Sequence, residues 1–187
     1  MNARLKEIFP GIDRYHVFAG GTPMDKDFGE ELVQHLPSLR RFGLSLSRRA
    51  DVADDLVQIT VERAISNAAR FDRSTRMQPW LFRIMRNAFI DMTRRARTAG
   101  TGIDVHETPE ALPHDPGAGI EARLMLETAW AAMETLPAEQ REILHLICVD
   151  ELSYAEAAEV LDIPKGTVMS RLSRARLALA RKMGMDG

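Results

Sequence analysis

Residues 162–182 read DIPKGTVMSRLSRARLALARK, and their charge sets them apart from the rest of the chain. The stretch holds two Lys and four Arg and has no acidic residue after Asp162, although the 187-residue chain has a formal net charge of −2. The preceding residues 150–161 hold four acidic residues and no Lys or Arg. A cationic segment on a slightly acidic protein indicates a local surface for an anionic partner.

A capped helix and a tight turn precede this basic segment. Ser153 and Glu156 have the spacing of a capping box, which predicts a helix that runs to Leu161. Pro164 suits the start of a second helix, because the amide hydrogen that proline lacks would be unpaired there. Two short helices joined by a tight turn predict a helix-turn-helix.

The second of these helices has an apolar side and a polar side. Its apolar residues share one face at helical spacing: Val168, Leu172, Ala175 and Leu179. Its other face carries hydroxyl and guanidinium groups: Thr167, Ser170, Ser173 and Arg174, flanked by Arg171 and Arg176. Such groups bind phosphates and base edges, so this face predicts DNA binding. The alternative is a helical hairpin with a solvated arginine face.

Residues 77–97, MQPWLFRIMRNAFIDMTRRAR, show the same division. One predicted helix face is apolar: Leu81, Ile84, Met85, Ala88 and Met92. The other holds four arginines and one asparagine: Arg83, Arg86, Asn87, Arg94 and Arg97. An asparagine amide among arginines can bond a base edge while the arginines hold phosphates, so a second DNA-binding face is predicted.

Two aromatic residues, Phe71 and Trp80, bracket a polar loop just before this helix. Their rings could stack on an unpaired base. For Trp80 we expect most of the ring to lie in the hydrophobic core.

The stretch DVADDLVQITVERAI, residues 51–65, differs in kind. Asp54, Asp55 and Gln58 present acidic and amide groups, and the intervening Leu56 and Val57 offer apolar contact. An acidic patch repels DNA, so it favours a protein partner. The alternative is a solvated helix N-terminus that is stabilised by the helix dipole.

The chain as a whole is predicted to be all-α, with two small helical domains. Helices are expected at about 25–47, 51–69 and 78–97 in a first domain, residues 25–98. Residues 99–119, rich in Gly, Pro and acidic residues, have the composition of a flexible linker to a second domain, residues 120–187. Residues 1–24 are expected to form an N-terminal extension, which Pro and Gly residues break up.

The chain has one cysteine, Cys148, which excludes an internal disulfide and a four-Cys zinc site and fits a reducing cytoplasm. No apolar run reaches the ~18–20 residues of a membrane span, and no signal peptide precedes the first helix, so we expect a cytoplasmic protein without membrane insertion.

On a helix over residues 138–150, His145 and Cys148 would share a face, but nucleophilic catalysis also needs a third group and a pocket.

We therefore expect a buried thiol at Cys148 and no enzyme activity. A metal site would have to combine these two residues with the linker histidines His106 and His114, which lack dedicated ligand spacing. No cofactor is expected.

Four stretches in order and at characteristic spacing resemble the extracytoplasmic-function (group IV) sigma factors of the bacterial sigma-seventy family. They are DDLVQITVERA at residues 54–64, FDRSTRMQPWLFRIMRNAFIDMTRR at 71–95, LPAEQREILHL at 136–146, and LSYAEAAEVLDIPKGTVMSRLSRARLAL at 152–179. The resemblance covers about residues 26–98 and 120–184. The N-terminal extension is longer than is usual in that family and has no assigned role.

The resemblance implies an alternative sigma factor that binds core RNA polymerase, through the β′ clamp helices and the β flap, and directs initiation at specific promoters. It implies that the β′ clamp helices are bound by Asp54, Asp55, Leu56, Val57 and Gln58. It implies that the −10 element is melted and read by Phe71, Trp80, Arg83, Arg86, Asn87 and Arg94. It implies that the −35 element is read by Lys165, Thr167, Ser170, Arg171, Arg174 and Arg176. An anti-sigma partner would hold the protein inactive, and the acidic linker would thread the RNA exit path.

Two other binding functions are open at this point. A sigma-like adaptor that titrates an anti-sigma protein needs no basic helices, yet this chain has eight Arg at residues 70–97. A simple helix-turn-helix repressor explains residues 153–182 but assigns nothing to residues 51–97.

Overall fold

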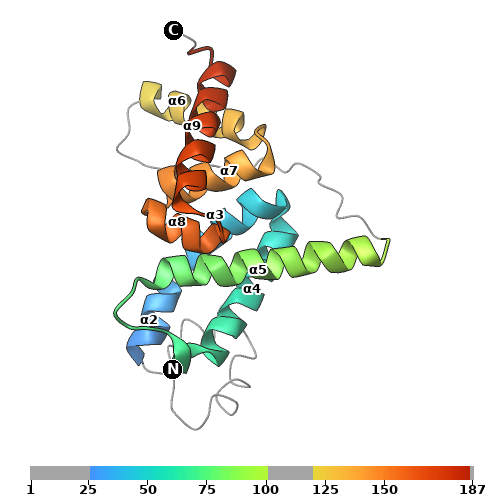
Figure 1. The fold of residues 1–187 in the computed structure, drawn as a ribbon, viewed down its shortest axis with the longest axis vertical. Coiled ribbons are helices and arrows are strands. Elements are labelled where there is room, and N and C mark those ends of the chain that lie inside the picture. Colours follow the sequence, from blue (N-terminus) through green and yellow to red (C-terminus); the bar gives the residue numbers. More distant parts are fainter. Residues whose placement is uncertain (1–25, 101–119, 186–187) are drawn as a thin grey trace. The chain divides into compact units, whose positions relative to one another are not determined.

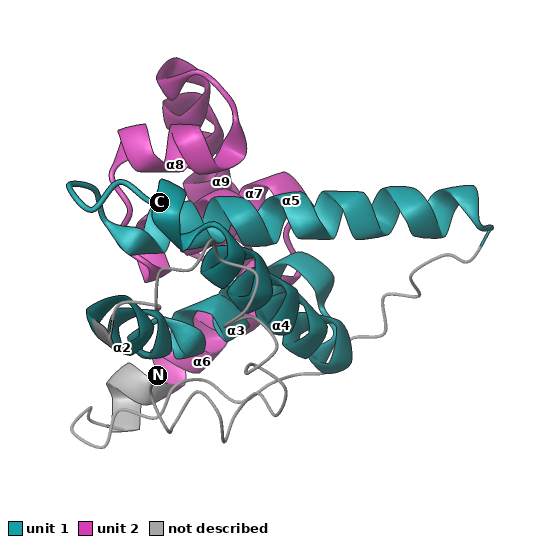
Figure 2. Ribbon diagram, turned by 90° about the horizontal axis from the view of Figure 1, so that it is seen from below, with its two compact units in different colours: residues 1–106 teal, residues 107–187 magenta. Residues whose placement is uncertain are grey.

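The chain divides into two compact units, residues 1–106 and residues 107–187 (Figure 2). The computed structural model describes residues 26–100 and 120–185, and in these ranges the secondary structure is helical throughout, without strands (Figure 1). The predicted all-α fold is therefore confirmed. The proposed extension at residues 1–24 and most of the proposed linker lie outside the described residues.

The described part of the first unit, residues 26–100, is built from four α-helices and one short 3₁₀ turn. In chain order they are α2 (Lys26–Gln34), α3 (Leu36–Ser47), α4 (Ala50–Ser66), η2 (Ala68–Arg70) and α5 (Met77–Thr98). α3 packs against both α4 and α5, and α4 packs against α5.

The expectation of a single helix over residues 25–47 is wrong, because the helix is interrupted at His35, between α2 and α3. The His35 amide donates to the Leu32 carbonyl at 3.2 Å, which closes a tight turn at the end of α2. Pro37 lies in the first turn of α3, where its missing amide hydrogen is tolerated but where a continuous helix would lose a hydrogen bond.

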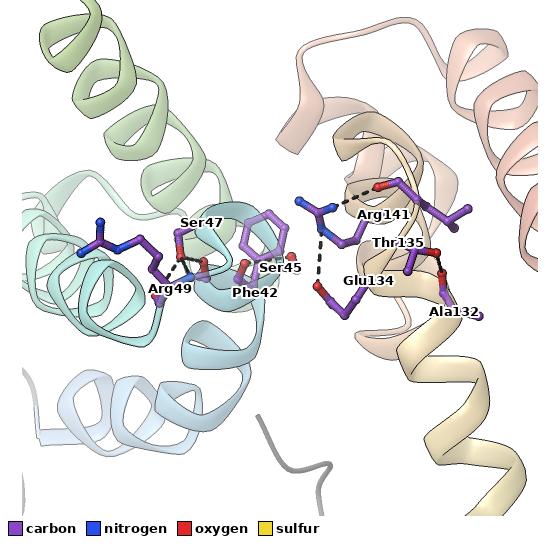
Figure 3. A network of polar contacts seen from close by, with 10 residues as sticks. Phe42, Ser45, Ser47, Arg49, Ala132, Glu134, Thr135 and Arg141 are labelled. Carbon is purple, nitrogen blue, oxygen red and sulfur yellow. Dashed lines mark hydrogen bonds and ion pairs between the residues drawn. The ribbon is translucent and has the colours of Figure 1, made fainter. Parts of the chain in front are cut away.

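The core of the first unit forms where α3 meets α4 and α5. Phe42 and Phe82 are fully buried, and their ring centroids lie 4.7 Å apart. Gly43 permits the close approach of α3 to α4, because a Cβ at this position would lie 3.3 Å from backbone atoms of Ala53. Ser47 joins the two helices: its hydroxyl donates to the Gly43 carbonyl at 2.8 Å and accepts from the Arg49 amide at 3.2 Å (Figure 3).

The second unit is also helical and has its core around α9. Its elements are α6 (Ile120–Glu134), α7 (Ala138–Leu144), the π-helical turn η3 (His145–Val149), α8 (Tyr154–Leu161) and α9 (Lys165–Lys182). α9 contacts α6, α7 and α8. Arg141 is only 4% exposed; it donates to the Leu136 carbonyl at 3.1 Å and lies 3.9 Å from the Glu134 carboxylate (Figure 3). These two contacts stabilise the junction between α6 and α7.

The expectation for Cys148 is wrong: the thiol is exposed, whereas His145 is fully buried. The helix widens after Leu144, and the Asp150 amide donates to the His145 carbonyl at 2.9 Å, five residues back. A π turn changes the angle between successive side chains, so the face predicted from α-helical spacing is lost. The Cys148 sulfur lies 3.9 Å from Nη2 of Arg176 on α9.

Candidate nucleic-acid and polymerase interfaces

α8, the turn after it and α9 form the predicted helix-turn-helix. The capping box is present: the Glu156 amide donates to Oγ of Ser153 at 3.2 Å, and the Ser153 amide donates to the Glu156 carboxylate at 2.8 Å. Asp162 ends α8 in the left-handed conformation, with φ of 54°, and the Ile163 amide donates to the Ala158 carbonyl at 3.1 Å. This short turn changes the direction of the chain, and α9 begins directly after Pro164.

The two faces of α9 separate as expected from the sequence. Val168, Leu172 and Ala175 are buried, and Leu179 is half-buried at the end of the same stripe. Because this apolar stripe packs into the core of the second unit, the opposite side of α9 is accessible to a ligand.

The residues predicted to read the −35 element have unequal surroundings. Lys165, Ser170, Arg174 and Arg176 are exposed, whereas Thr167 and Arg171 are half-buried. Nη2 of Arg171 lies 3.5 Å from the Glu139 carboxylate of α7. Nε of Arg174 donates to the Ser170 carbonyl at 3.3 Å, within its own helix. Arg174 therefore reaches solvent with no acidic partner among the described residues, whereas Arg171 is turned toward α7.

α5 has the same division into a buried and a polar side. Leu81, Met85 and Ala88 are buried, and Ile84 and Met92 are half-buried. The predicted polar residues lie on the accessible side: Arg83, Asn87, Arg94 and Arg97 are exposed, and Arg86 is half-buried. Arg63 of α4 lies 3.6 Å from Asp91, which links α4 to α5 beside this face.

Three aromatic rings gather where α2 meets the start of α5. The Phe71 and Trp80 centroids are 4.9 Å apart, and Phe28 of α2 lies 6.1 Å from Phe71 and 6.3 Å from Trp80. Phe71 is 8% exposed and Trp80 is half-buried, so Trp80 is partly a core residue, as expected. The role of Phe71 in base stacking stays a prediction, and in this conformation its ring is packed inside the unit.

Sequence reasoning missed Phe28. Its spacing of four residues from Leu32 marks a buried helix face, and both side chains are fully buried. A spacing of four residues between apolar side chains is typical of any buried helix face, so it does not predict that Phe28 contacts the segment of residues 71–80.

The segment between η2 and α5 is held by a carboxylate-centred turn. Oδ1 of Asp72 accepts from the Ser74 amide at 2.9 Å and from the Ser74 hydroxyl at 2.7 Å. The amide and the hydroxyl of Thr75 both donate to the Asp72 carbonyl, at 3.1 and 2.8 Å. The hydrogen bonds from the Ser74 hydroxyl and amide lower the pKa of Asp72 below its ordinary value, because they favour the ionised carboxylate.

The acidic surface predicted on α4 consists of three exposed residues: Asp54, Asp55 and Gln58. Nε of Arg40 on α3 donates to the Asp54 carboxylate at 2.8 Å, and the Gln58 amide donates to Glu62 at 3.1 Å. The other two residues of the predicted polymerase site, Leu56 and Val57, are 0% and 8% exposed and form part of the core. Of the five predicted residues, Asp54, Asp55 and Gln58 are therefore the ones that this conformation of α4 exposes to a partner.

The two helical units correspond to two conserved regions of bacterial sigma factors. Residues 32–99 match the family Sigma-70 region 2, and residues 126–179 match the family Sigma-70, region 4. The chain is 37% identical over 165 residues to the ECF RNA polymerase sigma factor EcfG of Rhodopseudomonas palustris, covering 88% of this chain and 90% of EcfG. It is 33% identical over 153 residues to SigM of Bacillus subtilis, covering 80% of this chain and 91% of SigM.

A solved structure has the same fold: the sigma factor RpoE of Bartonella quintana, crystallised with the anti-sigma factor NepR. It matches with a TM-score of 0.71 and 35% identity, over 87% of this chain and 100% of that one. The chain belongs to the ECF family of RNA polymerase sigma factors. The resemblance noted from the sequence is thus confirmed.

Two other expectations concern membranes and metals. Within residues 26–100 and 120–185, no helix is long and apolar enough to cross a membrane. In the same ranges, no three His, Cys, Asp or Glu side chains converge as a group that could hold a metal ion. His106 and His114 lie outside the described residues.

Proposed function

We propose a division of labour between the two units of this sigma factor. Unit 1 binds core polymerase through the exposed Asp54, Asp55 and Gln58 of α4 and reads the melted −10 element with α5 and the 71–80 segment. Unit 2 binds the −35 element by placing α9 in the major groove. The function is binding and positioning, with the chemistry of RNA synthesis supplied by the polymerase in the bacterial cytoplasm.

The observation that supports this proposal is the occurrence of one cationic helix face on each unit, each opposite a buried apolar stripe. α5 exposes Arg83, Asn87 and Arg94, and α9 exposes Lys165 and Arg174. Phosphate contacts from arginine and lysine orient a protein on DNA, and amide or guanidinium contacts to base edges supply sequence preference.

An anti-sigma protein is proposed to hold this chain inactive, since the structurally similar RpoE was solved with NepR bound. A purified anti-sigma protein that competes with core polymerase for the chain would support this regulation. Simultaneous binding of both partners would contradict it.

Run-off transcription tests the function directly. The purified chain and core RNA polymerase are incubated with a library of genomic fragments, and transcript starts are sequenced. We expect discrete starts that share two upstream elements. Binding to core polymerase without any specific start would favour an adaptor, and DNA binding without polymerase binding would favour a repressor.

A further inference from the structure

The helix α5 carries a single acidic residue among its arginines. Met77–Thr98 holds five arginines and one carboxylate, that of Asp91. Asp91 follows Asn87 by four residues and precedes Arg94 by three, so these side chains form one row along the helix. Asn87 and Arg94 are two of the proposed −10 contacts, and the Asp91 side chain is 46% exposed between them. A charged carboxylate in this row would repel the phosphates of a bound strand.

The charge of Asp91 is matched from the neighbouring helix. Nη2 of Arg63 on α4 lies 3.6 Å from Oδ2 of Asp91, and the Arg63 side chain is 42% exposed. Arg63 lies in the last turn of α4, where the side-chain and main-chain amides of Asn67 both donate to the Arg63 carbonyl, at 2.8 and 3.1 Å. The next residue, Ala64, is fully buried. The guanidinium is therefore presented to α5 from an anchored helix end.

Asp91 also has two candidate partners on its own helix. Arg94 and Arg95 follow it by three and four residues, the spacings at which opposite charges pair on a helix surface. Among the residues that the structure describes, however, Asp91 pairs with Arg63, and neither Arg94 nor Arg95 forms an ion pair. Both arginines are exposed. The contact between the two helices thus leaves two guanidinium groups of α5 available to an anion.

We propose that Arg63 is a positioning residue for −10 DNA: it neutralises Asp91 and so leaves Arg94 and Arg95 to bind backbone phosphates. This inference rests on the proposed reading of the −10 element by α5. Without Arg63, the Asp91 carboxylate keeps its full charge and attracts an arginine of its own helix, which reduces the number of cations that the strand meets. Arg63 therefore acts on DNA through Asp91 and not by touching the strand.

The test uses holoenzyme formed from the full chain and core polymerase, and a fluorescent promoter fragment with an unpaired −10 element. Binding is measured over a series of salt concentrations. Arg63→Gln should weaken binding about fivefold, the upper range for one exposed ion pair. It should also reduce the slope of log affinity against log salt by about 0.7, the contribution of one phosphate contact on a single strand. Unchanged affinity and slope in Arg63→Gln would overturn the proposal.

A double variant, Arg63→Gln with Asp91→Asn, separates this role from two others. It lacks the ion pair but also lacks the carboxylate, so its affinity should return to within about twofold of the unaltered chain, and its salt slope should recover. If Arg63 itself binds a phosphate, the double variant should bind as weakly as Arg63→Gln. The same weak binding is expected if the ion pair serves only the stability of the unit. Either result would contradict the proposal.

Arg83→Gln is the matched control, because it removes an exposed arginine of the same helix that has no ion pair with Asp91. Its loss of affinity should persist when Asp91→Asn is added. Equal restoration of Arg83→Gln and Arg63→Gln would indicate a general effect of charge and contradict the pairing. The unaltered holoenzyme should prefer the fragment to one with a scrambled −10 element. Absence of that preference would defeat the proposed −10 reading itself, whatever the result for Arg63.

Discussion

At the scale of single residues, Arg171 and Arg174 lie about one turn apart on α9 but have different surroundings. Arg171 is 25% exposed and lies close to Glu139, so part of its charge is already neutralised. Arg174 is exposed, and its Nε donates to a carbonyl of its own helix. A bound duplex should therefore gain more from Arg174 than from Arg171.

Replacing Arg174 by alanine should reduce −35-dependent initiation by about tenfold or more, because one guanidinium contact to a base edge is worth roughly 1–3 kcal/mol. Run-off transcription on promoters with intact and scrambled −35 elements measures the effect. Arg181→Ala, an exposed arginine in the last turn of the same helix, is the matched control and should have a small effect. Equal losses in the two variants would remove the assignment of Arg174.

Asn87 is the exposed amide on the arginine face of α5. We expect Asn87→Ala to change the preferred base at one −10 position with little effect on polymerase binding, because an amide contributes base discrimination rather than charge. Arg83→Ala should instead weaken −10 binding for all sequences and lower the salt dependence. Competition between −10 oligonucleotides for the holoenzyme gives both readings, and a uniform loss with Asn87→Ala would make Asn87 a structural residue.

At the scale of elements, α4 combines two roles on opposite sides. Its buried side, which includes Leu56, Val57 and Val61, joins the core, and its other side exposes the acidic surface. Arg40 of α3 pairs with Asp54, so the neighbouring helix also shapes this surface. The polar side is therefore presented on a rigid support.

Asp55→Arg should abolish co-purification with core polymerase, because it reverses a charge at the centre of the exposed acidic surface without altering the core. Circular dichroism should show an unchanged helix content. Glu30→Arg on α2, an equal charge reversal at an exposed acidic residue outside the surface, is the control and should retain binding. Full retention of polymerase by Asp55→Arg would count against this docking site.

The capping box of α8 gives a prediction about stability. Ser153→Ala removes the acceptor for the Glu156 amide and should lower the free energy of unfolding of unit 2 by about 1 kcal/mol. Glu156→Gln keeps a side chain that can bond back to the Ser153 amide, so the loss should be smaller. Urea unfolding followed by circular dichroism measures both variants, and equal stability of Ser153→Ala and the unaltered chain would contradict the cap.

At the scale of the whole molecule, each of the two compact units exposes a cationic helix face, on α5 and on α9 respectively. Each unit has its own buried core, and the proposed linker joins them in sequence. When both units are bound to one polymerase, each unit holds a fixed position along the DNA. The distance between the two promoter elements, and their relative rotation about the helix axis, must then fit the positions of the two units.

Inserting five base pairs between the −35 and −10 elements should therefore reduce initiation by about tenfold or more, because it rotates one element by about half a helical turn. The same insertion upstream of the −35 element is the control and should be neutral. Run-off transcription with purified holoenzyme compares the templates. Initiation that tolerates the insertion between the elements would show that the two units do not read DNA as a pair.

The sequence by itself determined the helical class, the capping box, the turn at Asp162 and the amphipathic faces of α5 and α9. These features depend on contacts within a few residues, such as the i to i+4 spacing of buried side chains and the bonds of a cap, which a linear pattern contains. The order and spacing of the motifs were likewise sufficient to indicate the sigma-factor family.

Tertiary structure alone decided which predicted site residues are exposed. Leu56, Val57 and Phe71 are buried, and Cys148 is exposed after a π turn. Phe28 meets the 71–80 segment although more than forty residues separate them in the chain. Burial and ring contacts are set by the packing of elements that are distant in sequence, and a local helical period does not specify that packing.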